Sequence, residues 1–215
     1  MALAPAIILI VLHLTTPSAA DGSARATEQR LALYEQQLTR DPEDLRTGSL
    51  YRQQIIAVRG YDRSIKFLGA LASRRGAGPN VYLTLALAYI DKVPDAGAIR
   101  QLYLGRDAMN ALTRSLERNK ASPSGIGDDV PLFIRGLVNL YYNTLLYKRT
   151  ELGLADLEAA RRLAPPQASW RPRIDTAIGD GYWRLGQRAR AREIWRDALA
   201  RFPEPAALEI GRAHV

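Results

Sequence analysis

Residues 172–205 read PRIDTAIGDGYWRLGQRARAREIWRDALARFPEP, and this stretch decides the fold. In its second half the apolar side chains recur at every third or fourth position, which predicts a helix with one buried face. Arg188, Arg192, Arg196 and Arg201 fall largely outside that face. These arginines either lie on the solvent-exposed face of the helix or form an anion-binding site, and the spacing of the apolar residues favours the solvent-exposed face.

The same stretch also carries small and bulky residues in a fixed order, namely Ile178, Gly179, Tyr182, Gly186, Ala191, Trp195, Ala198 and Pro203. This order resembles the tetratricopeptide repeat, a helix–turn–helix unit of about 34 residues. The resemblance implies that Gly179, Ala191 and Ala198 are small because two helices cross closely there. Gly186 makes the turn and the final proline stops the second helix. One departure is Asp175, where the family usually has an aromatic residue.

Weaker copies of the pattern lie upstream. The first helix of a unit is reproduced by Tyr82, Leu85, Ala86 and Tyr89, and its second helix is delayed by an insertion at residues 93–101. Gly136 begins a third such unit, and residues 34–65 resemble a weaker one. The resemblance implies roughly four units in an all-α, tetratricopeptide-type helical-repeat solenoid, a right-handed superhelix of antiparallel helix pairs.

Helical spacing of the apolar residues, broken by glycine and proline, continues from residue 27 to the last unit. Alternation with period two never persists, so helices are expected and strands are not. The expected helices cover residues 24–40, 44–58, 62–74, 79–90, 99–119, 130–148, 152–163, 171–185 and 188–201.

The two ends of the sequence differ from its middle. Residues 1–20 have the layout of a secretory signal peptide cleaved after about Ala20, although no basic residue precedes the apolar run. An uncleaved membrane anchor and an ordinary apolar segment remain as alternatives. Residues 209–215, EIGRAHV, resemble a translated sequencing adapter and are expected to be a non-native tail. Residues 21–208 then form the repeat domain of a periplasmic or secreted bacterial protein, with no transmembrane span in the mature chain.

Composition excludes several functions. The net charge of +8 comes mostly from arginine, which a GC-rich genome also favours, so we expect no nucleic-acid partner. Cysteine is absent and the two histidines, His13 and His214, lie near the ends. We therefore expect no enzyme, no metal and no cofactor. The acidic residues at helix starts are expected to cap them, with calcium or magnesium binding as the alternative; these are Asp41, Glu43, Asp44, Asp128 and Asp129.

The family resemblance places the exposed flank of each first helix in a concave groove. This assigns five groove candidates for partner binding: Arg173, Asp180, Trp183, Arg184 and Asn80. Trp183 beside two arginines would hold an extended, acidic peptide, or else it would pack against a following repeat. Leu83, Leu87 and Ile90 are too apolar for open solvent, so the insertion is expected to fold over them. The tyrosines at 141, 142 and 147 fit a core better than a ligand cage.

These expectations combine into a non-catalytic scaffold that binds a protein or peptide partner, acidic if the arginines of the groove are used. The alternative is a constitutive accessory subunit of a cell-envelope enzyme or transport complex. An enzyme is the third hypothesis, which the lack of histidine and cysteine between residues 14 and 213 disfavours. Repeats of this kind specify a fold and leave the partner to a few surface residues.

Overall fold

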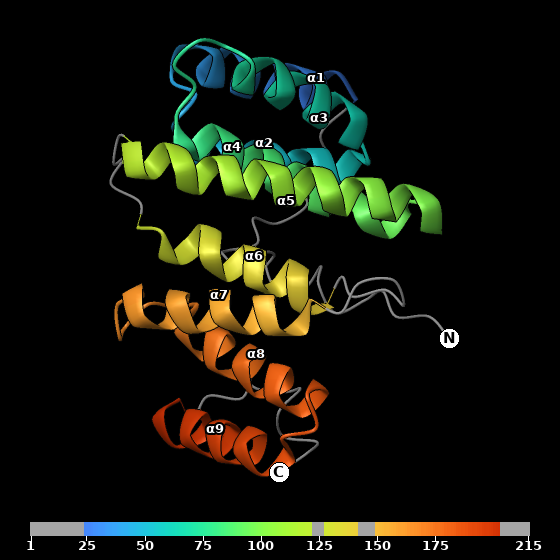
Figure 1. The fold of residues 1–215 in the computed structure, drawn as a ribbon. Coiled ribbons are helices and arrows are strands. Elements are labelled where there is room, and N and C mark those ends of the chain that lie inside the picture. Colours follow the sequence, from blue (N-terminus) through green and yellow to red (C-terminus); the bar gives the residue numbers. More distant parts are fainter. Residues whose placement is uncertain (1–23, 122–126, 142–148, 203–215) are drawn as a thin grey trace. The chain divides into compact units, whose positions relative to one another are not determined.

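The computed structural model describes residues 24–121, 127–141 and 149–202 (Figure 1). These residues form α-helices and one short 3-10 helix, and no strand occurs among them. The elements are α1 (Ala24–Arg40), α2 (Leu45–Val58), α3 (Tyr61–Ala72), α4 (Pro79–Lys92), η2 (Val93–Asp95), α5 (Ala98–Ala121), α6 (Asp129–Tyr141), α7 (Thr150–Leu163), α8 (Arg171–Arg184) and α9 (Arg188–Arg201).

Every helix expected from the sequence is present, with ends that agree within a few residues where the structure describes them. Three expectations lie outside the described residues: the signal peptide at 1–20, the tail at 209–215, and the stop at Pro203. The same holds for the last part of the expected helix 130–148. Asp44 caps α2, since its carboxylate accepts hydrogen bonds from the backbone of Arg46 and Thr47.

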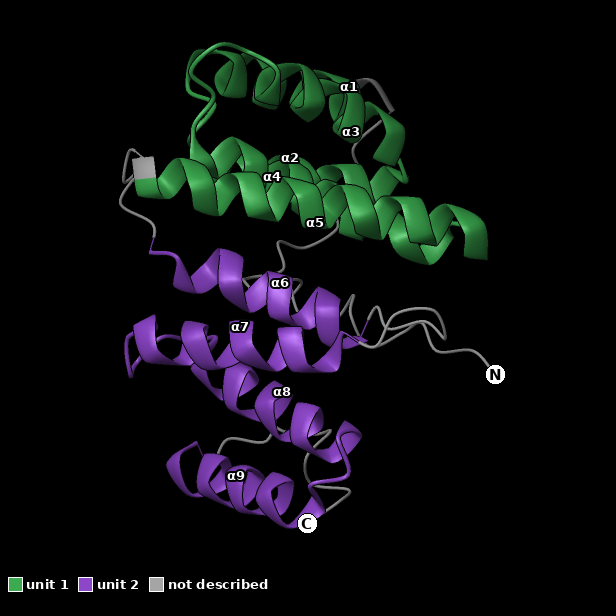
Figure 2. Ribbon diagram, in the orientation of Figure 1, with its two compact units in different colours: residues 1–126 green, residues 127–215 purple. Residues whose placement is uncertain are grey.

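The helices form two compact units, residues 1–126 and 127–215 (Figure 2). In the first unit, α2 packs against α1 and α3, and α4 packs against α3 and α5. In the second unit, consecutive helices pack from α6 to α9. Each unit also brings together helices two places apart, α2 with α4 and α6 with α8. This repeated neighbour pattern is that of stacked helix pairs, in which each pair buries an apolar face against the next.

One close helix crossing lies between α8 and α9. A Cβ added to Gly179 would lie 2.0 Å from Nε1 of Trp195, so only glycine fits beneath that ring. The indole is buried, and its Nε1 donates to the carbonyl of Thr176 at 3.1 Å. Ala191 and Ala198 on α9 are fully buried. The roles expected for these small residues are therefore confirmed.

A second close crossing joins α6 and α7. A Cβ on Gly136 would lie 2.7 Å from Cγ of Leu157, and one on Gly153 would lie 2.9 Å from the carbonyl oxygen of Gly136. Leu157 is fully buried and takes the place that Trp195 holds in the last pair. Gly136 was expected from the sequence, whereas its partner Gly153 was not.

The insertion between α4 and α5 consists of η2 and the start of a long α5. The side-chain amide of Gln101 donates to the carbonyls of Val93 and Ala96 and so closes this turn. η2 directly follows α4 and contacts it, and α2 packs against α4 as well. Of the three apolar residues that the insertion was expected to cover, Leu83 and Ile90 are buried and Leu87 is half-buried.

Two turns differ in how they reverse the chain. Gly186 adopts a φ of 78° between α8 and α9, as expected for a glycine turn. At the end of α2 the left-handed residue is Arg59, with a φ of 54°, while Gly60 keeps a negative φ. The left-handed position of this turn is therefore held by an arginine and not by the neighbouring glycine.

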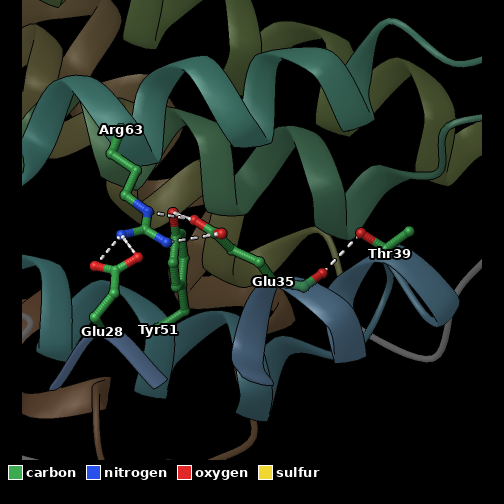
Figure 3. Close-up of polar contacts among 5 residues, drawn as sticks. All are labelled: Glu28, Glu35, Thr39, Tyr51 and Arg63. Carbon is green, nitrogen blue, oxygen red and sulfur yellow. Dashed lines mark hydrogen bonds and ion pairs between the residues drawn. The ribbon is translucent and has the colours of Figure 1, made fainter. Parts of the chain in front are cut away.

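An ion-pair network ties the first three helices together (Figure 3). Arg63 on α3 pairs with Glu28 and Glu35 on α1, with its Nε 2.7 Å from Oε1 of Glu35. The hydroxyl of Tyr51, a fully buried residue of α2, donates to the same carboxylate at 2.8 Å. Thr39 donates to the main-chain carbonyl of Glu35. One carboxylate on α1 thus holds α2 and α3 at once.

We predict that Gly179→Ala lowers the free energy of unfolding of the second unit by about 2–3 kcal/mol, because the new methyl group overpacks the Trp195 ring. Intrinsic fluorescence during urea unfolding reports this unit selectively, since the three tryptophans lie at positions 170, 183 and 195. Gly69→Ala is the control followed by circular dichroism, because a Cβ there meets nothing within 4 Å. A Gly179→Ala variant as stable as the parent would contradict the close crossing.

We also predict that the first unit loses stability in acid. Burial acts to raise the pKa of Glu35, but hydrogen bonds from Arg63 and Tyr51 outweigh it and leave the pKa below its ordinary value of 4.5. A lowered folded-state pKa contributes stability above the ordinary value and loses it as the pH falls through the folded value. The protection factors of the α1 amides against hydrogen exchange, which correct for the intrinsic pH dependence of exchange, should therefore fall below about pH 4.5.

Glu35→Gln should remove most of this pH dependence, and Glu117→Gln, at an exposed site without an ion pair in the described chain, should keep it. The idea fails if both variants titrate like the parent.

Candidate functional site

Charged and aromatic side chains from three helices meet at the C-terminal half of α8. We call them the α8 cluster: Tyr141 of α6, Asp180, Trp183 and Arg184 of α8, and Arg188 of α9. Arg184 is exposed, and its guanidinium carbon lies 5.1 Å from the centre of the Tyr141 ring on α6. The Tyr141 hydroxyl donates to Oδ2 of Asp180. α6 and α8 are therefore joined by a hydrogen bond that is flanked by an exposed cation.

Trp183 occupies the other side of the cluster. Its ring is half-buried and packs on Trp195, with centroids 5.6 Å apart and planes 37° apart. The guanidinium that lies over its face, at 5.1 Å, belongs to Arg188 at the start of α9. A cation over an indole face contributes about 0.5–1 kcal/mol at an exposed site. The arrangement leaves an aromatic ring and two arginines at the surface.

Tyr141 in the α8 cluster and Arg173 earlier on α8 both have shifted pKa values. Burial, followed by the charge and hydrogen bond of Asp180, raises the pKa of Tyr141 far above its ordinary value. The phenol therefore stays protonated as a hydrogen-bond donor. Burial lowers the pKa of Arg173, seven residues before Asp180 on α8, and a guanidinium starts so high that it remains a cation. Near neutral pH, Tyr141 and Arg173 therefore both act as hydrogen-bond donors.

Two of the five groove candidates are buried. Asp180 is 9% exposed, and its carboxylate accepts from Tyr141. Asn80 is 6% exposed, and its side-chain amide donates to the carbonyl of Glu43 at 2.9 Å. Both therefore hold helices together and offer little surface to a partner. Arg173 and Trp183 are half-buried, and Arg184 is exposed.

Glu43 caps a different helix from the one expected. Rather than capping the helix that follows it, its carboxylate accepts from the backbone N–H of Asn80 at 2.9 Å and of Val81 at 3.3 Å. These are free amides at the start of α4, where the helix dipole favours a carboxylate. Asp129 likewise reaches a second helix start, because its Oδ2 accepts from Nε1 of Trp170 at 3.0 Å. Each acidic residue ties the starts of two helices.

Asp175, the departure from the repeat pattern, lies at the centre of a buried charge cluster. It is fully buried, and the guanidinium nitrogens of three arginines surround its carboxylate. Arg161 lies 3.0 Å away, Arg201 3.4 Å and Arg171 4.0 Å. At the equivalent position of the earlier unit, Tyr82 is buried and donates to the carbonyl of Ala72. At this position of the repeat, the last unit therefore has a buried carboxylate paired with arginines, whereas the earlier unit has a buried tyrosine.

We predict that Asp175→Ala lowers the stability of the second unit by about 1 kcal/mol, because it removes the shared counter-ion of three arginines, of which Arg161 and Arg201 are 34% and 42% exposed and so partly hydrated. Tryptophan fluorescence during urea unfolding measures the loss. Asp197→Ala, an exposed position on the neighbouring α9, serves as the control and should change stability little. Equal effects of the two substitutions would show that the buried pairing contributes nothing specific.

Sequence reasoning missed two members of the α8 cluster. Arg188 was assigned to the solvated coat of α9, and it is exposed, but it also covers the Trp183 ring. Tyr141 was interpreted as a core residue. It is half-buried, and its hydroxyl donates a hydrogen bond to Asp180. Tyr142 and Tyr147 lie outside the described residues. The only available signal for Arg188 was its position just after the Gly186 turn, which folds it back toward α8.

Two further observations limit the chemistry of the described residues. No group of three or more histidine, cysteine, aspartate or glutamate residues is placed to hold a metal ion there. Among the described helices, none combines the length and the apolar character needed to cross a membrane.

Comparison with known proteins defines the class. The structure is similar to TTC0263, a thermophilic TPR protein of Thermus thermophilus, with a TM-score of 0.61, 19% identity, and 88% of this chain and 90% of that chain covered. MamA matches with a TM-score of 0.56, 16% identity, and coverage of 89% and 93%. YrrB, a TPR protein with an unusual peptide-binding site, matches with a TM-score of 0.57, 15% identity, and coverage of 88% and 84%. No family model and no curated protein matches the sequence.

The neighbour pattern of the helices and these similarities together define an α-helical repeat protein. More specifically, the chain has the tetratricopeptide-repeat fold. Identities below 20% establish this fold and nothing further.

Proposed function

We propose that the chain is a non-catalytic scaffold that binds a protein or peptide partner at the α8 cluster. Two cation–aromatic pairs carry this proposal. The exposed Arg184 lies on the Tyr141 ring. Arg188 covers the half-exposed ring of Trp183. Each pair combines an apolar face with a cation, and both are held by buried neighbours. Tryptophan and arginine in such settings dominate the energetics of protein interfaces.

The chemistry of the cluster favours an extended peptide with acidic side chains. The aromatic rings pack against aliphatic parts of the peptide, while Arg184 and Arg188 bind carboxylates through paired hydrogen bonds. Asp180 is buried against Tyr141 and so adds little repulsion at the surface. A peptide-binding site is named for YrrB, which shares the fold. This agrees with the proposed type of partner.

The absence of catalysis is part of the proposal. Nucleophilic and acid–base mechanisms need a group whose pKa lies near the working pH. The pKa shifts of Tyr141 and Tyr182 run upward, away from neutrality, through burial first and a neighbouring carboxylate second. Residues 14–213 contain no histidine or cysteine. Binding is therefore the activity that this surface supports best.

We predict that octapeptides selected on the full chain from a random phage-display library are enriched in aspartate and glutamate. Trp183→Ala should weaken a selected peptide about tenfold and Arg184→Ala about fivefold, because each removes one cation–aromatic face. Sodium chloride at about 0.5 M should weaken the charged component. The fluorescence of the tryptophans measures the affinity.

Arg192→Ala is the matched control, since this arginine of α9 is exposed and forms no hydrogen bond, ion pair or ring contact within the described residues. Its affinity should equal that of the parent. The proposal is rejected if the library yields no saturable peptide, or if Arg192→Ala and Arg184→Ala weaken the peptide equally.

We further propose that the chain is exported after removal of residues 1–20 and acts in the cell envelope. Its support is the apolar run followed by small residues near Ala20. Affinity capture from envelope extract separates a scaffold from a permanent subunit. A scaffold releases its partner in salt, whereas a permanent subunit co-purifies at constant stoichiometry. A mature N-terminus upstream of residue 20 would argue against export by this signal.

A further inference from the structure

The first unit contains a hollow of about 330 Å³ that the proposed function does not use. It is lined by Tyr82 of α4 and by Arg114, Glu117 and Arg118 of α5. Its volume is near the lower end of the range for small-ligand pockets, about 300–1000 Å³. It can therefore hold one or two side chains of a partner.

The packing of α5 fixes which residues face this hollow. Leu112, Ser115 and Leu116 are buried, and the Ser115 hydroxyl donates to the carbonyl of Pro79 at the start of α4, at 2.9 Å. Residues three and four apart share a face of a helix. Arg114 and Arg118 are consequently held on the exposed side, one turn apart.

The wall of the hollow is rigid. Tyr82 is 6% exposed, and its hydroxyl donates to the carbonyl of Ala72 at 2.9 Å. With the hydroxyl engaged, the ring contributes an apolar surface against which an aliphatic stem can pack.

The charges that face the hollow are not paired within the part of the chain that the structure describes. Among the described residues, Arg114, Glu117 and Arg118 form no hydrogen bond or ion pair, whereas Arg52 and Arg63 of the same unit are paired with carboxylates. Two guanidinium groups one turn apart suit a carboxylate, which each can bind through two N–H donors. The carboxylate of Glu117, which lies between the two arginines in sequence, repels a second negative charge on a ligand and attracts a positive one.

We propose that this hollow is a second binding site, which takes the side chain of a glutamate or aspartate in a peptide whose next residue is basic. Arg114 and Arg118 bind the carboxylate, the Tyr82 ring packs against its stem, and Glu117 pairs with the basic neighbour. The site belongs to the first unit, whereas the α8 cluster belongs to the second. The negative Glu117 favours a singly charged carboxylate over a phosphate.

The test uses the full chain and the peptide acetyl-Gly-Glu-Lys-Gly-amide, followed by NMR of the Tyr82 ring and of the Arg114 and Arg118 Nε–H groups. We expect saturable shifts and at least a tenfold loss of affinity in the double variant Arg114→Ala/Arg118→Ala. The control Arg100→Ala/Arg106→Ala removes two exposed arginines from the same helix and should bind like the parent. Circular dichroism checks that each variant folds.

Three comparisons make the result specific. Replacing the peptide glutamate by glutamine should abolish binding. Glu117→Gln should weaken the Glu-Lys peptide but leave acetyl-Gly-Glu-Gln-Gly-amide unchanged, and Trp183→Ala should have no effect. No saturable shift up to about 10 mM, equal losses in both double variants, or tighter binding of the phosphoserine analogue would overturn the proposal. Failure of the α8 cluster to bind peptides leaves this test untouched.

Discussion

The close approach of paired helices is the constraint on which the rest of the structure depends. Beneath Trp195 only a residue without Cβ fits, and Gly136 meets Leu157 in the same way. A short distance between helix axes places each first helix against the apolar stripe of its partner, and it also fixes their rotation. Rotation in turn decides which residues reach the surface. Trp183 and Arg184 lie at the exposed end of α8 because Gly179 and Ile178 are turned into the core.

Polar contacts then fix the order in which the pairs stack. Arg52 of α2 pairs with Asp91 of α4, two largely buried side chains whose closest atoms are 2.7 Å apart. Tyr141 and Asp180 join α6 to α8 in the second unit. Apolar burial alone tolerates a slip of one helix along another, whereas a buried donor without its acceptor costs about 1–3 kcal/mol. These pairs therefore select one register among several that would bury similar apolar area.

The helices and the crossing of the last helix pair were predicted from the sequence because both depend on residue types within one helix–turn–helix repeat. Gly179, Ala191 and Ala198 were assigned through the resemblance of their order to the tetratricopeptide repeat, and all three lie in the core. The binding surface was predicted less well, because it depends on neighbours that are distant in sequence. Asn80 is covered by Glu43, which lies 37 residues earlier, and Arg188 turns back onto Trp183. No local pattern marks such contacts, although the fold places them together.

The arginines illustrate why net charge alone is a poor guide to binding. Arg161, Arg171 and Arg201 surround Asp175, and their charge is thereby partly neutralised inside the fold. These groups contribute to the excess of +8 but offer reduced attraction to a partner. The arginines that lie on aromatic faces keep most of their charge, since a ring has no net charge to cancel it. A basic residue on a ring at the surface is therefore a better marker of a binding site than a basic run in the sequence.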